Sequence, residues 1–465
     1  MRRISVGLAV LLAVGTNASA RDLNKQNYLI GERAAGMGGA FVSLTGDATS
    51  AYYNPAGLGG LHKKGLSLSA SAYQLSVENY PRALDIDMGG GTSIRGQMSS
   101  STFATFPSSI AYVLPFGSRE KGATNHVFSF SVLVPDYDKL AARIEAPVGD
   151  YAVALNGSYL NTDMTYWIGP SYAVQFGSGV RLGVSVFALA YMTETQAKFG
   201  AKMTDLSGTN SYSTQAFDVS GTSVSMLGQA GIQWDVSDSW TVGVTARSPT
   251  FGRLYSSVKM LQLSSLYAEN GGVPQAGGYA DRIEVTKGVT LERRLPLVVA
   301  AGANYHAPGK FTVAVDATAH LAQPKYRQFN GPLAYPTDPS GNLILDQSRA
   351  IDPVIEAKTN QVVNANLGVE VNLTPKTVAR FGVFTDLSAV DKVFAPDPVT
   401  PVLDRYGASV GLGLEGEKST TSFGIVYSGG SGSAPGLNDL LGEPVNKVKV
   451  TAHTITAVLA GSADF

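Results

Sequence analysis

The chain lacks cysteine altogether, which excludes a disulfide framework, a thiolate nucleophile and a cysteine-ligated metal. It is also poor in charge: charged residues make up 15% of the sequence, and the formal net charge is −1. A weakly charged, electrically balanced chain gives no basis for a nucleic-acid partner.

Long hydrophobic runs are missing as well. Beyond residue 20, no window holds the ~18 uninterrupted apolar residues that a membrane-spanning helix needs. The one apolar run, Ile4–Gly15, follows Arg2 and Arg3 and precedes the small residues Ala18-Ser19-Ala20. This is the pattern of a secretory signal peptide, so residues 1–20 are predicted to be removed on export.

What the sequence does contain is alternation with a period of two. In Val363–Leu373, every second residue is apolar, and the residues between them are small or polar. The same pattern recurs in 181–190 and 311–320. Side chains of a strand point alternately to opposite faces, so each strand has one wholly apolar face. Lipid outside and a lumen inside a transmembrane β-barrel would produce this pattern.

The connections between these strands are predicted to alternate in length, as in outer-membrane barrels. Short turns are expected at 115–126, 177–179, 235–239, 305–310, 373–377 and 415–421. Long polar loops are expected near 79–104, 137–160, 198–220, 250–282, 321–358, 388–403 and 429–446. This spacing predicts an all-β protein, an antiparallel barrel of about fourteen strands over residues 64–465. An even strand number places both termini on the periplasmic side.

The stretch from Gly31 to Leu61 differs from the rest, because it is rich in glycine and alanine and carries few charges. Asn54 and Pro55 favour a tight turn there. Such a segment cannot build its own core, so residues 21–63 are predicted to form a hatch, a plug inside the barrel lumen.

Several motifs together resemble the FadL/TodX family of outer-membrane transport proteins. They are the hatch with Asn54-Pro55-Ala56-Gly57-Leu58, the strand 168–172, the hairpin 231–249, the stretch 295–316, and Arg380-Phe381-Gly382. The C-terminal strand, with Ile455, Leu459 and Phe465 on one parity, resembles the terminal strand of outer-membrane proteins. The resemblance implies a fourteen-stranded barrel, a small N-terminal hatch and uptake of hydrophobic molecules such as long-chain fatty acids or aromatic hydrocarbons. The hatch motif residues are Gly31, Arg33, Gly36, Gly38, Gly39, Asn54, Pro55, Ala56 and Gly57.

The hatch is also similar to that of barrel proteins that act as secretion accessories. An alternative function is therefore a barrel that docks secreted or surface partners. A continuous apolar tunnel in the lumen would favour transport, and a solid lumen with apolar loop tips would favour docking.

Two further features of the wall are predicted. The third strand is expected to end at Val134 and Pro135, because proline removes a ladder donor, and a wall opening is expected there. Glu370 and Arg380 are expected to face each other across a tight turn on the lumen side and to fix the register of that hairpin. We expect this pair to be structural.

Other motifs carry less weight. Gly411–Gly416 matches GxGxxG, but it lies within an expected strand, where small inward residues explain it. The five histidines lack ligand spacing, and no segment resembles a nucleophile motif, so we expect no metal, no cofactor and no enzymatic activity. Interface girdles are the default interpretation of Trp167, Trp234, Trp240, Tyr172, Tyr191 and Tyr427, although some could line a ligand pocket.

The sequence thus predicts a monomeric outer-membrane channel for passive uptake of a hydrophobic small molecule. Membrane lipid would surround its wall, and lipopolysaccharide would contact its outer loops. An apolar groove among the loops would capture the solute, and a shift at the Asn54–Ala56 turn would open the path.

Overall fold

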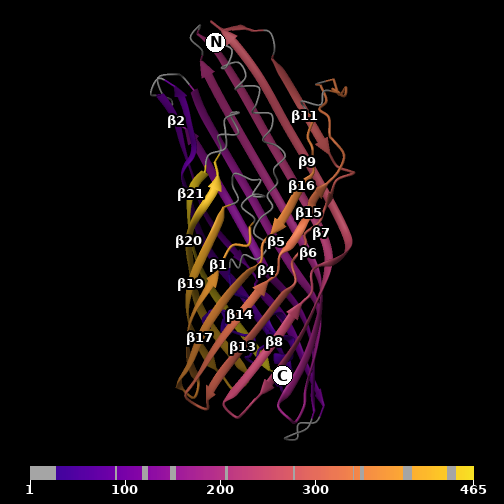
Figure 1. The fold of residues 1–465 in the computed structure, drawn as a ribbon, viewed down its shortest axis with the longest axis vertical. Coiled ribbons are helices and arrows are strands. Elements are labelled where there is room, and N and C mark those ends of the chain that lie inside the picture. Colours follow the sequence, from indigo (N-terminus) through magenta and orange to yellow (C-terminus); the bar gives the residue numbers. More distant parts are fainter. Residues whose placement is uncertain are drawn as a thin grey trace.

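Long antiparallel strands form a wall that closes on itself (Figure 1). In this computed structural model, the first strand pairs with the last from Gly65↔Asp464 to Asn79↔Thr451. Closure joins the first strand of the sheet to the last, which is the condition for placing a sheet in lipid. The structure describes residues 28–89, 92–117, 124–146, 153–204, 208–275, 278–338, 340–345, 350–390, 401–436 and 447–464.

The wall begins with β1 (Gly65–Gly89), β2 (Thr92–Phe106), β3 (Ser109–Gly117), β4 (Asn125–Ala146), β5 (Val153–Gln175), β6 (Val180–Thr204) and β7 (Thr209–Asp235). It continues with β8 (Trp240–Arg247), β9 (Phe251–Asn270), β10 (Val273–Pro274), β11 (Tyr279–Val285), β13 (Val298–Ala307) and β14 (Phe311–His320). It ends with β17 (Val362–Thr374), β18 (Thr377–Asp386), β19 (Val402–Glu415), β20 (Ser419–Pro435) and β21 (Lys447–Asp464).

These strands make a fourteen-stranded barrel, as the sequence predicts. At three places around the wall, two labelled segments together take the place of one barrel strand: β2 with β3, β8 with β9, and β11 with β13. For example, β7 pairs with β8 near the short-turn end and with β9 further along. The two-residue β10 only extends a hairpin with β9.

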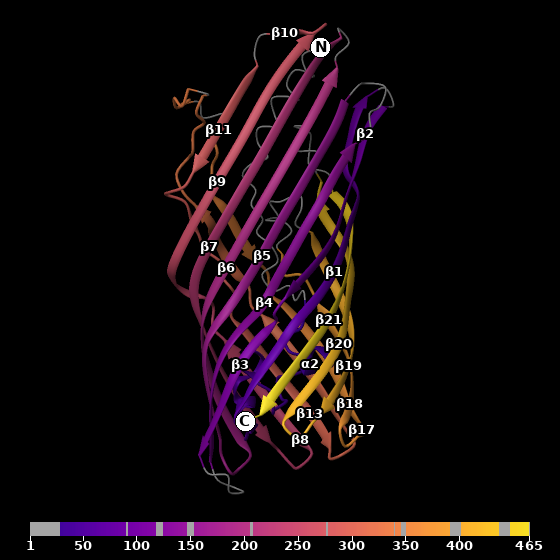
Figure 2. The same ribbon diagram turned by 180° about the vertical axis from the view of Figure 1, so that it is seen from behind.

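One end of the barrel carries the short turns, and at the other end β4–β7 and β9 rise well above β17–β21 (Figure 2). Five of the six predicted short turns are present, at 176–179, 236–239, 308–310, 375–376 and 416–418. The sixth, at 115–126, includes residues that lie outside the described ones. Much of the sequence predicted as long loops is instead paired strand. Residues 79–89 pair with 92–99, and 198–204 pair with 210–216. Backbone pairing continues through these stretches, and inward side chains such as Tyr80, Met98 and Phe199 pack in an apolar core.

The outer face of the wall is apolar, as the alternation predicts. Val184, Val186, Leu367, Val383 and Val410 are all exposed. Trp234 and Trp240 are also exposed and flank a short turn, as expected of an interface girdle. In the described residues, no helix is long and apolar enough to span a membrane.

Residues 28–61, which we call the N-terminal segment, lie inside this wall and are mostly buried. They form the helices α2 (Glu32–Gly36) and α3 (Ser50–Tyr53) and the 3₁₀ helix η2 (Pro55–Gly60). Helix α2 packs against β18–β21, and η2 packs against β4–β7. The segment therefore touches the wall from both sides of the lumen.

A second, smaller sheet consists of β12 (Thr290–Leu291), β15 (Gln323–Asn330) and β16 (Ile355–Thr359). It follows on from the hairpin of β14 and β17. Leu291, Phe329 and Ile355 on this sheet are buried in the same apolar core as wall residues of β4–β7.

Candidate functional site

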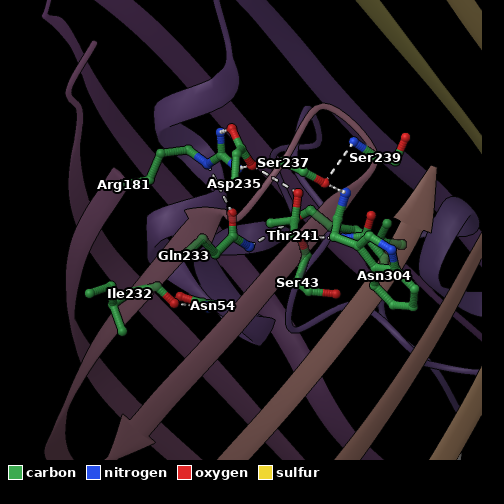
Figure 3. A network of polar contacts seen from close by, with 12 residues as sticks. Ser43, Asn54, Arg181, Ile232, Gln233, Asp235, Ser237, Ser239, Thr241 and Asn304 are labelled. Atoms are coloured by element: carbon green, nitrogen blue, oxygen red, sulfur yellow. Dashed lines mark hydrogen bonds and ion pairs between the residues drawn. The ribbon is translucent and has the colours of Figure 1, made fainter. Parts of the chain in front are cut away.

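The turn at Asn54 anchors the N-terminal segment to the wall. Asn54 is fully buried, and its side-chain oxygen accepts a hydrogen bond from the Ala56 amide at 3.1 Å. Its amide nitrogen donates to Val42 O at 2.8 Å and to Ile232 O of β7 at 3.2 Å (Figure 3). Pro55 then begins η2, where its missing amide costs nothing and its φ suits the helix. One side chain thus caps a helix and ties two other elements together.

Wall side chains also form hydrogen bonds with the backbone of residues 41–45. Gln233 Nε2 donates to Val42 O and Leu44 O, each at 3.0 Å, and Asn304 Nδ2 donates to Ser43 O at 2.9 Å (Figure 3). Asp316 accepts from the amides of Phe41 and Val42. These bonds use backbone atoms that no secondary structure satisfies, so the wall supplies the partners that the segment lacks.

Glycines let the wall approach this segment closely. Among the described residues, four pairs of directly opposed glycines face it: Gly183 with Gly231, Gly243 with Gly302, Gly368 with Gly382, and Gly411 with Gly424. A Cβ at Gly183 would overlap the backbone of Pro55 and Ala56, and one at Gly382 would overlap Met37 and Gly38. Gly411, in the GxGxxG stretch, lies within β19 and would bring a Cβ to 3.2 Å from Gly36 Cα. Because these glycines have no side chain, the segment can lie directly against the backbone of the wall. We call this glycine-lined surface the seat of the segment.

The hatch glycines predicted from the sequence lie in this seat. Gly31 precedes α2 with φ 80°, and Gly38 and Gly39 follow it with φ 64° and 79°, a region that other residues rarely adopt. A Cβ at Gly36 would come 2.9 Å from Arg380 Cβ, and one at Gly57 would come 2.8 Å from Leu44 O.

Glu370 lies directly opposite Arg380 in the β17–β18 hairpin, with Arg380 Nε 2.8 Å from Glu370 Oε2. The carboxylate has a second partner that the sequence did not predict. Arg33 in α2 donates from Nε and Nη2 to the two oxygens of Glu370, each at 3.0 Å, and from Nη1 to Thr45 O at 2.8 Å. One wall carboxylate therefore joins the hairpin to the N-terminal segment.

A polar cavity of about 720 Å³ opens at the short-turn rim. Its lining includes Leu44 of the N-terminal segment, Asp235 and Asp238 of a turn, and His306 of β13. Arg181 forms an ion pair with Asp235 there (Figure 3). The exposed lining of this cavity is mainly polar, so it suits water and polar groups better than a hydrophobic molecule.

The other side of the segment meets aromatic rings, which we call the aromatic cluster: Tyr28, Tyr52, Phe106, Tyr137, Trp167 and Phe187. Ring centroids are 4.5 Å apart for Tyr28–Phe106 and 4.7 Å for Phe106–Tyr137. Trp167 lies 5.2 Å from Tyr52 and 5.7 Å from Phe187. All six rings belong to one buried apolar core, which extends from the segment to β2, β4, β5 and β6.

The girdle interpretation is therefore wrong for two residues. Trp167 and Tyr191 have exposed fractions of 1% and 2% and belong to the lumen core. Trp167 sits between Tyr166 and Ile168, so the apolar run did not reveal which parity faces inward. Tyr172 and Tyr427 are exposed on the outer face.

The hydrogen-bond ladder between β2/β3 and β4 is interrupted beside this cluster. β3 pairs with β4 up to Ser109↔Leu133, and β2 pairs with it again only from Ser100↔Ala142. Between them, residues 101–108 have no ladder partner among the described residues of β4. We call this interval the ladder break. It is crossed by hydrogen bonds such as Val134 N to Ser108 O at 3.0 Å.

Val134 and Pro135 lie at this break, but the strand does not end there, contrary to the sequence-based expectation. β4 continues to Ala146, and Pro135 falls in a register shift between Leu133 and Asp136 in the β4–β5 ladder. Pro135 has no backbone N–H to donate, and a β-bulge leaves it out of the ladder. Pairing with β5 then resumes at Asp136↔Thr165.

The described residues contain no group of three or more His, Cys, Asp or Glu side chains that could hold a metal ion. His320 is buried at the end of β14, and His126 and His453 stack on exposed tyrosines of the outer wall.

No protein-family profile and no curated protein sequence matches this chain. Solved structures do match it over nearly its whole length. A FadL homologue of Pseudomonas aeruginosa is 16% identical with a TM-score of 0.57, covering 94% of this chain and 98% of the other. The toluene transporter TodX of P. putida is 13% identical with a TM-score of 0.57, covering 96% and 99%. The monoaromatic hydrocarbon channel CymD is 12% identical with a TM-score of 0.53, covering 94% and 97%. The chain has the fold of these FadL/TodX-like proteins.

Proposed function

We propose that the protein is an outer-membrane channel for passive uptake of hydrophobic solutes such as long-chain fatty acids or aromatic hydrocarbons. The observation that carries this proposal is the aromatic cluster, which runs inside the lumen from the N-terminal segment to the ladder break. The similar folds in solved structures are described as a monoaromatic hydrocarbon channel, a FadL homologue and a toluene transporter. Both termini would face the periplasm, and lipopolysaccharide would contact the tall outer strands.

The route follows from solvation. Burying apolar surface is favourable by ~25 cal/mol per Å², so a hydrophobic solute gains free energy in the aromatic cluster. The short-turn rim offers it a polar cavity instead. Leaving sideways at the ladder break, beside Val134 and Pro135, would deliver the solute to lipid without exposing it to water. We therefore favour lateral release.

Arg247 bears on the kind of solute. Its guanidinium lies 4.8 Å from the ring centre of Trp167 and 5.8 Å from that of Tyr52. Its Nε is buried without a hydrogen-bond partner, and no ion pair to it is found among the described residues. An unpaired cation beside an apolar surface suits a solute with a carboxylate at one end. Hydrocarbons would gain nothing from it.

Phe106 and Phe103 provide a matched test. Both belong to β2, but Phe106 is 4% exposed in the aromatic cluster, whereas Phe103 is 63% exposed on the outer face. Phe106→Ser should raise the half-saturating solute concentration for uptake about thirtyfold, since a buried phenylalanine contributes ~2 kcal/mol. Phe103→Ser should leave it unchanged.

The measurement is uptake of labelled fatty acids and alkylbenzenes by cells that lack any other such channel. Equal uptake by the two variants and the wild type would contradict the proposed route. A wild-type protein that inserts correctly but transports neither solute would favour the alternative, a barrel that docks surface or secreted partners.

A further inference from the structure

The outward side chains of β6 change character along the strand. They are apolar at every second position from Leu182 to Met192, and they are polar, charged or glycine from Glu194 to Lys202. About ten residue steps of ~3.3 Å, on a strand tilted by ~40°, rise ~25 Å, which is the height of the lipid-facing band of an outer-membrane barrel. Because Leu182 lies beside a short turn, the change between Met192 and Glu194 marks the opposite edge of the lipid band.

The strand register carries this edge across the neighbouring strands β5, β7 and β9, which rise side by side with β6 (Figure 2). The residues level with Met192 are Met164 of β5, Thr222 of β7 and Ser257 of β9. The residues level with Glu194 are Thr162, Ser220 and Lys259 on the same three strands.

A groove of about 410 Å³ lies on the outer face of the wall at this edge. The short side chains of Ser220 and Thr222 on β7 form its floor. Longer side chains of the two flanking strands form its sides: Met192 and Glu194 of β6, and Tyr255 and Lys259 of β9. The groove therefore has an apolar end toward the lipid band and a charged end away from it.

The two charges at the far end of the groove stay apart. Lys259 and Glu194 are separated by two strand spacings, ~10 Å, and no ion pair to Lys259 is found among the described residues. Glu284 of the neighbouring β11 pairs instead with Arg282. Glu194 accepts a hydrogen bond from Gln196 Nε2 at 3.0 Å. The groove thus presents an unpaired ammonium group on one side and a carboxylate on the other.

We propose that this groove binds the head of a phosphorylated glycolipid of the outer leaflet, with Lys259 donating to a phosphate and Glu194 accepting from sugar hydroxyls. The acyl chains continue along Met192, Tyr255 and the lipid band, where burial of apolar surface is favourable. The inference rests on the proposed orientation, with the short turns in the periplasm. It is independent of solute uptake.

The lining favours a sugar head over a phosphate alone. The hydroxyls of Ser220, Thr222 and Ser257 line the groove and can both donate to and accept from sugar hydroxyls. The carboxylate of Glu194 repels phosphate, so the phosphate is placed on the Lys259 side, where a charge-assisted hydrogen bond forms. The groove extends over β6, β7 and β9, which is wider than one phosphate group requires.

Binding can be measured by native mass spectrometry, with the purified, delipidated protein titrated with diphosphoryl lipid A. Lys259→Gln should raise the dissociation constant about tenfold, because it removes the charged donor to phosphate. Lys449→Gln is the matched control. Lys449 is an exposed, outward lysine of β21, on another part of the wall, and its replacement should change nothing.

The shape of the groove gives a second test in the same titration. Ser220→Phe fills the floor and leaves both charges in place, so it should weaken binding at least tenfold. Ser431→Phe adds the same ring to the exposed outer face of β20 and should have no effect.

The absence of cysteine allows the bound lipid to be located. Ser257→Cys places a unique thiol in the groove, and lipid A should slow its reaction with a water-soluble maleimide several-fold. Ser431→Cys, outside the groove, should react at the same rate with and without lipid A.

Equal dissociation constants for Lys259→Gln, Ser220→Phe and the wild type would overturn the site. Equally tight binding of phosphatidylglycerol would overturn it as well, because that lipid has the phosphate without the sugar head, and the groove would then hold ordinary boundary lipid only. Failure of the proposed function is a separate result. If lipid A binds as expected but cells take up no hydrophobic solute, the glycolipid site stands and the channel assignment is wrong.

Discussion

The two sides of the lumen hold the N-terminal segment by different means. On the side of β6–β8, β13, β14 and β17–β19, glycines bring backbone against backbone, and Gln233, Asn304 and Asp316 bond its peptide groups. Toward β2 and β5, two tyrosines of the segment contact aromatic rings: Tyr28 packs on Phe106, and Tyr52 packs on Trp167. The contacts on the first side are directional hydrogen bonds and close backbone packing, whereas those on the second side are apolar.

The two kinds of contact differ in whether a solute can replace them. Hydrogen bonds and glycine contacts fit only one partner, because a displaced peptide group would be left unpaired. Apolar contacts are non-directional, so a hydrophobic solute can replace a ring without an unmet polar group. We infer that the glycine-lined side fixes the segment and that the aromatic side admits solute.

Removing the segment is the strongest test of this comparison. Deletion of residues 21–61 should leave a folded, heat-modifiable barrel, because the wall hydrogen bonds join strand to strand. The truncated barrel should conduct small polar solutes freely. Conductance in planar bilayers measures this, and a value equal to that of the wild type would show that the segment does not close the lumen.

A single glycine substitution should produce a smaller effect of the same kind. Gly183→Val would place side-chain atoms on the backbone of Pro55 and Ala56, so the segment could no longer seat and conductance should rise several-fold. Gly228→Val is the control, because a Cβ there has no neighbour closer than 4.0 Å. Phe106→Ser, on the aromatic side, should alter uptake and leave conductance unchanged. A rise in conductance for Phe106→Ser as well would abolish the distinction between the two sides.

Much of the fold could be predicted from the sequence because alternation is a local signal. Each strand shows its lipid face by itself, and short turns limit where the next strand can begin. The opposition of Glu370 and Arg380 follows in this way from one tight hairpin. The tall strand ends opposite the short turns could not be predicted similarly, because a strand face outside lipid need not be apolar.

The contacts that hold the N-terminal segment in its seat were harder to predict from the sequence. Gly183 and Gly231 are 48 residues apart in number, and they become a pair only through the register of β6 and β7. Asp316 lies on the inward parity of its strand, but its partners are backbone amides of Phe41 and Val42, which no residue pattern identifies. Contacts between the lumen and a plug without regular structure depend on the whole assembled barrel.

The subtlest test concerns the charged contact on the glycine-lined side. Glu370 has a 12% exposed side chain and binds Arg33 of the segment and Arg380 of the wall. Glu370→Gln keeps the shape but removes the carboxylate that both Arg33 and Arg380 contact. Breaking a buried pair in this way costs about 3 kcal/mol. Because the strand ladder is untouched, we expect this loss to loosen the segment and not the barrel.

The expected result is faster proteolysis of the N-terminal segment and brief openings in planar bilayers, with the heat-modifiable mobility of the barrel retained. Glu292→Gln serves as the control, since its pair with Arg294 is half-exposed and contributes at most about 1 kcal/mol. If Glu370→Gln destabilises the β17–β18 hairpin while the segment stays protected, the carboxylate acts only within the wall. If the segment loosens while the hairpin persists, the contact of Arg33 with Glu370 is the part that closes the lumen, and the directional side of the seat depends on charge as well as on glycine.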